Sequence, residues 1–348
     1  MTTPTSLPAP RTPAPDAAPP LRWGILGTGG IAHTFAGTLR KNTRQVVHAC
    51  ASRSQEKADA FAREFGASRA YGSYEALAAD PDVQAIYVAT PHSHHAEHAL
   101  LTIAAGKPTL VEKSFTRTAA EARLVVEAAT ASGVPLMEAM WTRFLPSMDV
   151  VRQLLEGGVL GDVETVLADH GQYFAVNPAH RLYDPELAGG ALLDLGIYPL
   201  SFAFFALGTP GRVTAHGTAA ETGVDRQVSA ILDAYAAHPH AHAVVTTTLA
   251  AKTPTTASIA GSEARVELPG PFYVPQPVTL VARDGTRLTS DAPTIVTHEG
   301  LCHEAAHFAT FVAEGRRESP LLPLAETVSI METMDAIRAQ LRPDGVSA

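Results

Sequence analysis

Residues 21–32 read LRWGILGTGGIA and decide the fold. A short apolar run ends in the pattern G-x-G-x-x-A, and residues 31–39 then show helical spacing, which predicts a strand, a tight turn and a helix start. Gly27 permits the turn, Gly29 lets a pyrophosphate approach the backbone, and Ala32 lets the helix pack closely on the strand. The free N–H groups at the helix start favour phosphate. The cofactor-binding residues predicted in this stretch are Gly27, Gly29, Gly30 and Ile31.

Beyond this stretch, the first half of the chain alternates between short apolar runs and helical patterns. Short, wholly apolar strands that alternate with helices predict a parallel sheet with helices on both faces. From residue 163 onward, the pattern changes to a period of two, with Thr, Ser or His on many alternate positions. This predicts a second sheet with one polar face, which meets either water or a second subunit. The strand candidates of the first half are Leu21–Gly27, Val46–Cys50, Ala85–Ala89, Thr109–Val111 and Pro135–Glu138.

Length, charge and cysteine content limit the class of protein. A chain of 348 residues is too long for one ordinary core and suggests two domains. The formal net charge of −9 argues against nucleic acid and anionic membrane surfaces as partners. The 2 cysteines, Cys50 and Cys302, cannot build a disulfide framework and favour a reducing, cytoplasmic setting, although a single bridge stays open.

Two segments resemble targeting or membrane sequences only superficially. Residues 1–20 are rich in proline and poor in large apolar side chains, so we expect a disordered tail that is partly polyproline II. This tail lacks the apolar core of a signal peptide. Residues Ala191–Leu207 form the most apolar stretch, but Asp194 and Pro199 interrupt it, which predicts a buried helix rather than a membrane span.

The residues after the second strand indicate which dinucleotide binds. They read Ala-Ser-Arg-Ser over residues 51–54, without the Asp or Glu that usually holds the ribose 2′-hydroxyl of NAD. The guanidinium of Arg53 suits a 2′-phosphate, which it binds through two parallel hydrogen bonds. NADP(H) is therefore predicted over NAD(H), with Ser52 and Arg53 as contacts. The alternative is that Arg53 is a solvated loop charge.

Three further motifs follow strands or open the apolar helix. They are Thr90-Pro91-His92-Ser93-His94-His95, Val111-Glu112-Lys113-Ser114 and the glycine-rich run from Gly189 to Tyr198. Together with residues 137–144 and 318–338, they resemble the Gfo/Idh/MocA oxidoreductases. Within that family, the likeness is to the branch of the dimeric dihydrodiol dehydrogenases and NADP-dependent D-xylose 1-dehydrogenases. It spans essentially all of residues 21–340.

The resemblance implies an N-terminal Rossmann domain, residues 21–142, and a C-terminal α+β domain, residues 143–345. The fold class is then α/β with a parallel sheet, plus a second domain with an open, mostly antiparallel sheet. That second sheet is expected to mediate a homodimer or a higher homo-oligomer. The residues expected at the cofactor, besides the glycine turn and Arg53, are Thr90, Pro91, His92, His95, Glu112 and Lys113.

The resemblance also implies a catalytic set. It matches Lys113 with a lysine beside the nicotinamide ribose, Asp194 with the acid of the glycine-rich segment, and Tyr198 with the tyrosine of this branch. Ser114 departs from the family, in which proline is usual. The spacing agrees, because Asp194 and Tyr198 are i, i+4 and would share one face of a helix.

The chemistry of these side chains suits proton exchange. A nearby Lys113 ammonium would lower the tyrosine pKa from its ordinary ~10. Tyr198 is then expected to act as acid or base on the substrate oxygen while hydride moves at the nicotinamide. Asp194 is expected to pair with a substrate hydroxyl or with the lysine. The alternatives are a helix-capping Asp and a buried Tyr whose hydroxyl is satisfied.

Aromatic and arginine side chains are candidates for the substrate pocket. The main candidates are Trp141, Arg143 and Arg181, and the resemblance favours Trp141 in particular. Weaker candidates, since an aromatic residue more often belongs to the core, are Phe144, Tyr173, Phe174, Phe272 and Tyr273.

Two histidine-rich segments raise the question of a metal. Residues 303–307 read His-Glu-Ala-Ala-His, the H-E-x-x-H pattern of zinc proteases, but the glycine and third histidine of metzincins do not follow. His94 and His98 are spaced i, i+4 without a further ligand set. We expect no metal, and an amphipathic helix at residues 302–314 instead. Its apolar face is predicted to hold Leu301, Ala305, Phe308 and Val312.

Together these features predict an NADP(H)-dependent oxidoreductase that acts on a sugar, a cyclic polyol or a dihydrodiol. The alternative from another class is a cofactor-binding regulator or sensor on the same fold. The presence of Lys113, Asp194 and Tyr198 favours the enzyme, because a sensor has no need of all three.

Overall fold

The structure is a computed structural model that describes residues 4–341. The described chain forms two compact units. The first comprises residues 13–144 and 297–328, and the second comprises residues 4–12, 145–296 and 329–341. Residues 297–328 thus belong with the first unit, whereas the predicted limits, 21–142 and 143–345, assign them to the second domain.

The first unit is built on a parallel sheet of six strands in the order β3-β2-β1-β4-β5-β6. All neighbouring strands run parallel, which confirms the α/β class predicted for the first half. The strands are β1 (Arg22–Leu26), β2 (Val46–Ala51), β3 (Arg69–Tyr71), β4 (Ala85–Val88), β5 (Thr109–Glu112) and β6 (Leu136–Ala139). The helices are α1 (Gly30–Asn42), α2 (Gln55–Phe65), α3 (Tyr74–Ala78), α4 (His95–Ala104), α5 (Ala119–Ser132) and α8 (Leu301–Ala313).

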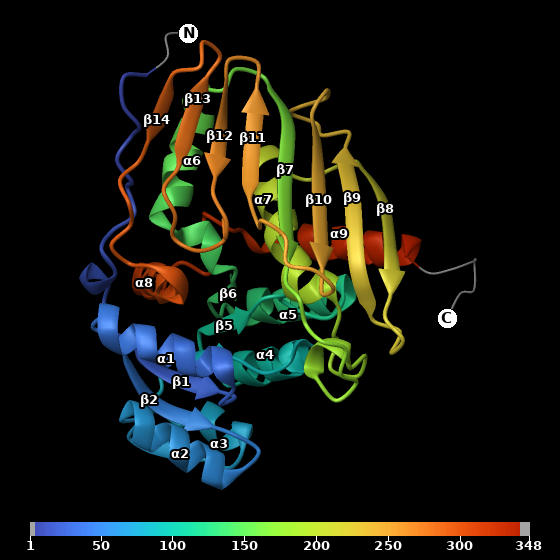
Figure 1. Ribbon diagram of the computed structural model, residues 1–348. Helices are drawn as coiled ribbons and strands as arrows, with labels where there is room; N and C mark the ends of the chain where they lie inside the picture. Colours follow the sequence, from blue (N-terminus) through green and yellow to red (C-terminus); the bar gives the residue numbers. More distant parts are fainter. Residues whose placement is uncertain (1–3, 342–348) are drawn as a thin grey trace. The chain divides into compact units, whose positions relative to one another are not determined.

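Helix α8 completes the helical layer that α1 begins, and the two helices lie side by side (Figure 1). Phe308 of α8 and Phe35 of α1 both pack on Trp23 of β1, with ring centroids 5.2 and 5.4 Å away. Phe35 also stacks on Tyr87 of β4. Both helices therefore cover the sheet face that carries Trp23 and Tyr87. Three residues of the predicted apolar face of α8 are fully buried, and the fourth, Val312, is half-buried.

The second unit is built on a sheet of eight strands in the order β14-β13-β12-β11-β7-β10-β9-β8. All neighbours are antiparallel except β7 and β10, which confirms the mostly antiparallel sheet. The strands are β7 (Val163–Gly171), β8 (Arg212–Ala219), β9 (Asp225–Asp233), β10 (His242–Thr248), β11 (Ala257–Gly261), β12 (Ala264–Leu268), β13 (Thr279–Ala282) and β14 (Arg287–Thr289).

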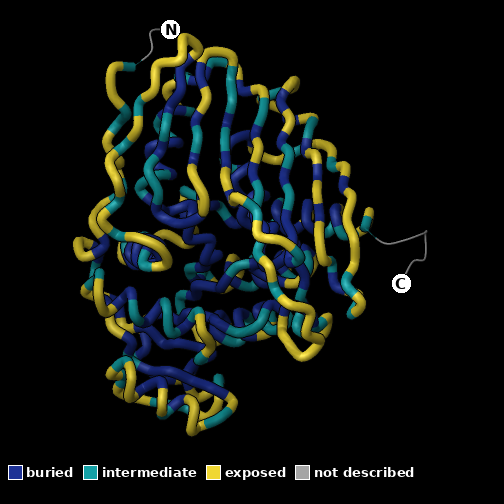
Figure 2. Tube along the Cα trace, viewed as in Figure 1, coloured by how far each residue is buried: buried dark blue, intermediate teal, exposed yellow. Residues whose placement is uncertain are grey.

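One face of this sheet is covered by helices, and the other is open. Helix α7 (Ile197–Leu207) packs on β7, β10 and β11, and α6 (Pro146–Glu156) contacts α7 through Arg152, whose guanidinium lies over the Phe205 ring. Helix α9 (Leu324–Gln340) begins in the first unit and continues in the second. Along the strands, buried residues alternate with more exposed ones (Figure 2).

The N-terminal segment differs from the predicted disordered tail. Residues 1–3 lie outside the described residues, but Pro15–Ala17 form a 3₁₀ turn flanked by extended residues with polyproline II dihedral angles. The Arg11 guanidinium lies 2.9 Å from the Asp149 carboxylate, and the Arg11 N–H donates to the same carboxylate. Arg11 compensates the buried charge of Asp149, and this stabilisation offsets part of the entropy lost when the N-terminal segment is ordered. The few apolar side chains of the segment alone could not offset that loss.

Two further predictions concern the whole chain. Within the described residues, no helix combines the length and the apolar composition that a membrane crossing requires. Both cysteines, Cys50 and Cys302, are buried and unbridged.

Candidate functional site

The turn between β1 and α1 has room for a phosphate group. Gly27 has a φ of 99°, and a side-chain carbon there would lie 2.8 Å from the Ala89 carbonyl oxygen, so glycine is required. Side-chain carbons at Gly29 and Gly30 would meet no atom within 4 Å. Helices α2, α3 and α5 begin with a capping hydroxyl, whereas the N-cap of α1 is Gly29, without a side-chain hydrogen bond. This open turn fits a pyrophosphate on the helix N-terminus.

The residues predicted to contact the ribose follow β2 directly. Ser52 is buried, and Ser54 caps α2 with its side chain. Arg53 is exposed between them. Burial raises the Tyr74 pKa, and the nearby charge of Arg53 opposes that rise. Burial lowers the His98 pKa, and the charge of Arg53 lowers it further. Arg53 therefore presents its cation beside the turn after β2, where a 2′-phosphate would need it.

The segment after β4 holds Thr90, Pro91 and His92, followed by His95 at the start of α4, and all four are predicted at the cofactor. His95 is buried, and its ring nitrogens lie 2.8 Å from the Ser114 carbonyl oxygen and 2.7 Å from that of Thr90. Burial lowers the His95 pKa to about 4, although the two carbonyl groups oppose the shift. The neutral ring donates to one carbonyl at a time, so it ties the loop after β4 to the loop after β5. A contact with the cofactor stays a prediction.

The Glu112 side chain accepts a hydrogen bond from the backbone of Lys113. Tyr87 of β4 donates its hydroxyl proton to Glu112, and Oε2 of Glu112 accepts the Lys113 backbone N–H over 3.1 Å. The Lys113 side chain is half-buried. Burial lowers the His298 pKa, and the Lys113 charge lowers it further. Two of the predicted cofactor residues are thus joined directly.

The residues Trp141 and Arg143, predicted to contact substrate, are almost wholly buried in the first unit. The Trp141 ring stacks on the His298 ring, with centroids 5.5 Å apart. Arg143 donates to the Glu326 carboxylate over 2.7 Å and to the Leu321 carbonyl oxygen over 3.2 Å. Arg143 therefore links the turn after β6 to residues 321–326 within the first unit, and its role toward substrate stays a prediction.

The glycine-rich segment before α7 approaches other groups closely. A side-chain carbon at Gly189 would lie 2.6 Å from the Leu182 carbonyl oxygen, and one at Gly190, where φ is 116°, would overlap the Asp225 carboxylate. Asp225 accepts the Leu192 N–H over 2.6 Å, and burial raises the pKa of this carboxyl to about 6. Asp225 thus holds the helix start. No sequence pattern signals this role.

The predicted buried helix is present, but it begins with a π-helical turn at Leu192–Gly196, followed by α7. Pro199 has no N–H for the Leu195 carbonyl group, and in an α-helix its ring would crowd that group. The wider π turn relieves both problems, and such turns are frequent at functional sites. Asp194 and Tyr198 are buried on this segment, but the α-helical spacing that predicts one shared face does not apply within the turn.

Asp194 has a cationic partner within its own unit. Nη2 of Arg181 lies 3.0 Å from Oδ1 of Asp194, and the Arg181 side chain is half exposed. The ion pair therefore connects a predicted substrate residue, Arg181, with a predicted catalytic residue, Asp194. Of the weaker candidates, Tyr173 is exposed, and Phe272 is wholly buried in the core.

Two aromatic side chains pack against the ring of Tyr198, and Gln172 contacts both of them. The centroids of the His170 and Tyr273 rings lie 5.2 and 4.6 Å from that of Tyr198, and 4.6 Å from each other. The Gln172 amide nitrogen lies 3.0 Å from Nε2 of His170 and 3.4 Å from the Tyr273 hydroxyl. Sequence reasoning names Tyr273 only as a weak candidate and misses His170 and Gln172. The spacing of these two polar residues, His170 near the end of β7 and Gln172 just after it, is the signal that was available.

The H-E-x-x-H segment lies on α8. His307 bonds the Ser319 hydroxyl at 2.8 Å and stacks on Phe144, while His303 is buried. Within residues 4–341, the grouping with three potential metal ligands in reach is elsewhere, at His48, Asp80 and Asp82. There the Arg69 guanidinium lies 2.8 Å from each carboxylate and pairs with both of them.

A parallel sheet with an open glycine turn at its first helix, joined to a second unit that carries an acid and a tyrosine on a buried helix, defines a dinucleotide-binding oxidoreductase. Residues 21–140 match the model of the Gfo/Idh/MocA oxidoreductase family with its NAD-binding Rossmann fold, and residues 148–267 match the Gfo/Idh/MocA C-terminal domain. The chain belongs to the Gfo/Idh/MocA family, as its motifs predict.

Similar proteins and solved structures agree with this family assignment. The chain is 35% identical over 367 residues to a D-xylose 1-dehydrogenase (NADP(+)) of Hypocrea jecorina, covering 94% of this chain and 93% of that protein. It is 36% identical over 328 residues to a trans-1,2-dihydrobenzene-1,2-diol dehydrogenase of Bos taurus, covering 91% and 96%. It is also similar to the structure of KijD10, a 3-ketoreductase from Actinomadura kijaniata, in complex with NADP and TDP-benzene. That match has a TM-score of 0.80 at 26% identity and covers 93% of this chain and 98% of the other.

Proposed function

We propose that this oxidoreductase transfers hydride between NADP(H) and a CH–OH or C=O group of a sugar, a cyclic polyol or a dihydrodiol. The observation that carries the proposal is the similarity, at 35% and 36% identity over more than 90% of the chain, to dehydrogenases named for D-xylose and for a dihydrodiol. Substrates of both kinds offer adjacent hydroxyl groups. The proposed catalytic set is Lys113, Asp194 and Tyr198.

NADP(H) is the proposed cofactor, with NAD(H) second. The open turn at Gly29 and Gly30 supports a pyrophosphate site, and exposed Arg53 beside Ser52 supports a site for the 2′-phosphate. One relative and one structural neighbour are named with NADP. When bound, the nicotinamide supplies the carbon that accepts or gives the hydride.

Tyr198 exchanges the proton of the substrate oxygen. During oxidation, the alcohol O–H proton passes to the Tyr198 oxygen as the hydride leaves the carbon, and reduction reverses both transfers. The Lys113 ammonium favours the anionic form of that oxygen. Asp194, whose charge Arg181 balances, accepts a hydrogen bond from a neighbouring substrate hydroxyl. Lys113 belongs to the first unit and Tyr198 to the second, so their approach is part of this proposal.

The test is a substrate screen in which NADPH absorbance is followed. Purified protein is given NADP⁺ or NAD⁺ with D-xylose, other aldoses, cyclic polyols and trans-dihydrodiols. We expect turnover on at least one class, faster with NADP⁺ than with NAD⁺. A protein that binds NADPH but oxidises none of these classes, and reduces none of their ketones, would be the cofactor-binding regulator or sensor instead.

We also propose that the open face of the second sheet binds a second copy of the chain. Ile231, Val244 and Leu167 are register partners on β9, β10 and β7, and they form one row on that face. Leu167 and Ile231 are 48% and 47% exposed, which leaves an apolar strip on an otherwise polar surface.

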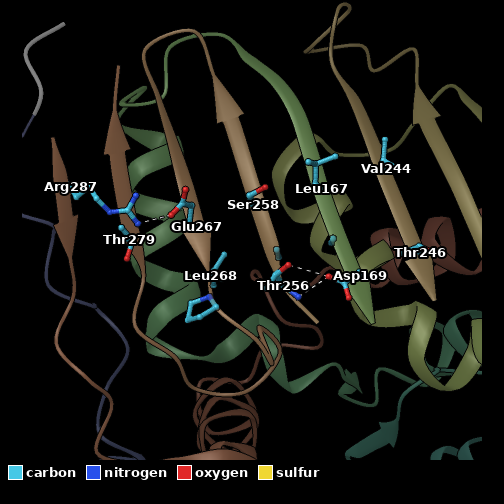
Figure 3. A pocket seen from close by; sticks show the side chains of 13 residues that line it. Leu167, Asp169, Val244, Thr246, Thr256, Ser258, Glu267, Leu268, Thr279 and Arg287 are labelled. Atoms are coloured by element: carbon cyan, nitrogen blue, oxygen red, sulfur yellow. Dashed lines mark hydrogen bonds and ion pairs between the residues drawn. The ribbon is translucent and has the colours of Figure 1, made fainter. Parts of the chain in front are cut away.

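An open hollow of about 610 Å³ lies on the same face (Figure 3). Leu167 and Val244 line the hollow. Glu267 of β12 and Arg287 of β14 line it too, and their charged groups lie 2.8 Å apart. An apolar strip bordered by hydroxyl groups and ion pairs suits a self-complementary contact about a two-fold axis.

A cytoplasmic location is also part of the proposal, and the unbridged cysteines support it.

A further inference from the structure

Helix α8 carries a carboxyl group that is wholly enclosed. Glu304 has no exposed surface, and within the described residues neither of its carboxyl oxygens has a hydrogen-bond partner. A buried carboxylate without partners is so costly that the group either takes up a proton or is bound by water. Glu304 belongs to the H-E-x-x-H segment, which the proposed function does not use.

The geometry directs Glu304 toward the sheet. Phe308, one helical turn later, packs on β1 from the same side of α8, so Glu304 faces the sheet surface that α8 covers. Tyr87 lies on that surface, and its hydroxyl donates to Glu112. Glu304 and Glu112 are thus on the same side of the sheet, where Glu112 holds the Lys113 backbone.

Electrostatics support a neutral Glu304. Burial has the largest effect, and the charges of Glu112 and Glu138 add to it, so that the Glu304 pKa lies well above its ordinary value. Glu138 is the register partner of Val111 and therefore points to the opposite face of the sheet, where it accepts bonds from the Phe115 N–H and the Thr327 hydroxyl. Burial raises the Glu138 pKa to about 7.

Within the described chain, the other groups around α8 add no resolved effect on Glu304. Those on the packed elements are Asp16, His33, Arg40, Lys41, Arg143, His298 and Glu299. On α8 itself, burial raises the Cys302 pKa to about 12 and lowers the His303 pKa to about 4, so both side chains are neutral near pH 7.

We propose that Glu304 is a positioning residue for the Lys113 segment, held as a neutral carboxylic acid that shares its proton with the Glu112 carboxylate through a buried water. A neutral acid at this place lets Glu112 keep its charge, accept the Lys113 N–H and balance the Lys113 ammonium. An ionised Glu304 would instead place two carboxylates on one buried side of the sheet. The positioning role rests on the proposed function, because it acts through Lys113 on the cofactor, whereas the protonation state of Glu304 does not.

The first experiment measures the protonation state alone. Infrared spectra are recorded at about pH 8.5, above the pKa values of about 7 for Glu138 and about 6 for Asp225, so that both are mostly ionised. We expect a protonated-carboxyl band in the wild-type protein that Glu304→Gln removes and Glu138→Gln leaves. A wild-type spectrum that Glu304→Gln does not change would overturn the proposal, whether or not the protein binds NADPH.

The second experiment separates position from stability. Glu304→Leu removes the acid but fills its space, so we expect a melting temperature at or above that of the wild type and a Kd for NADPH raised ~10-fold. Glu304→Gln keeps a neutral hydrogen-bonding group and is expected to restore the Kd to within ~2-fold. A Glu304→Leu variant that binds NADPH as tightly as the wild type would contradict the positioning role. A wild-type protein that does not bind NADPH would contradict the proposed function instead.

Discussion

Gly190 and Asp225 are packed so closely that a side-chain carbon on the glycine would overlap the carboxylate. Asp225 in turn accepts the Leu192 N–H, which starts the π-helical turn that carries Asp194. The glycine of the G-G motif thus serves the second unit as a point of close approach. The position of the candidate acid depends on it.

Replacement of Gly190 by alanine is expected to destabilise the second unit. The backbone has a φ of 116°, and the added carbon has to displace Asp225. We expect a loss of more than ~2 kcal/mol in the free energy of unfolding, measured by chemical denaturation. Gly223→Ala is the matched control, because Gly223 also has a positive φ but open space around it, and its cost is expected to be about 1 kcal/mol. Equal losses in the two variants would remove the role of Asp225.

Tyr198→Phe tests the proton exchange. The variant keeps the ring that packs on His170 and Tyr273 and removes only the hydroxyl. We expect kcat to fall ~100-fold, with the Kd for NADPH unchanged. Tyr273→Phe, which loses a hydroxyl from the neighbouring ring, is expected to have a much smaller effect. Full activity in Tyr198→Phe would exclude that residue as the acid or base.

Arg53→Ala tests the preference for the 2′-phosphate. Loss of a charge-assisted contact is expected to raise the Kd for NADPH ~10-fold and to leave the Kd for NADH unchanged. Fluorescence titration with both cofactors measures the two values. Arg63→Ala, an exposed arginine on α2, is the control for general charge effects. A wild-type protein that prefers NADH would refute the argument from Arg53.

The Arg11–Asp149 contact predicts a pH dependence of stability. Burial opposes ionisation of Asp149, but the hydrogen bonds and charge of Arg11 outweigh it and hold the pKa below the ordinary 3.8. A depressed pKa stabilises the fold above the unfolded-state value, and this contribution is lost as the pH falls through the folded-state value. We therefore expect Asp149→Asn to lower the melting temperature by a few degrees at pH 7 and to converge with the wild type below about pH 3. Arg11→Ala should reproduce the loss at pH 7; no loss in either variant would favour a disordered N-terminal segment.

Leu167→Asp tests the contact between copies. A carboxylate in the apolar row is expected to convert a wild-type dimer into a monomer in sedimentation velocity, without a fall in melting temperature. Leu124→Asp is the matched control, because Leu124 is 58% exposed and belongs to the first unit rather than to this sheet. A monomeric wild-type protein would refute the proposed contact.

Local patterns predicted those features whose causes are local. The turn at Gly27, the alternation of strands and helices, and the apolar face around Phe308 all follow from spacing over a few residues, and the structure contains them. The motifs around Lys113 and Tyr198 also predicted the family correctly. Their catalytic roles stay predictions.

Features that depend on distant residues were not predictable in this way. The start of the π-helical turn and the close packing of Gly190 both involve Asp225, which belongs to the distant strand β9. His170 approaches Tyr198 only because α7 packs on β7. The order seen in the N-terminal segment depends on a contact between residues 138 positions apart.

The place of α8 has a consequence for biosynthesis. A ribosome delivers residues 13–144 first, but Phe308, which packs on Trp23, and the Arg317 carbonyl group, which accepts the Leu136 N–H, emerge only after residues 145–296. At the usual rates of translation, this delay is roughly 8–35 s. The nascent nucleotide-binding unit therefore waits with that face of its sheet covered by α1 but not yet by α8, and a gene fragment that ends at residue 144 encodes the glycine turn without the helix that completes this layer.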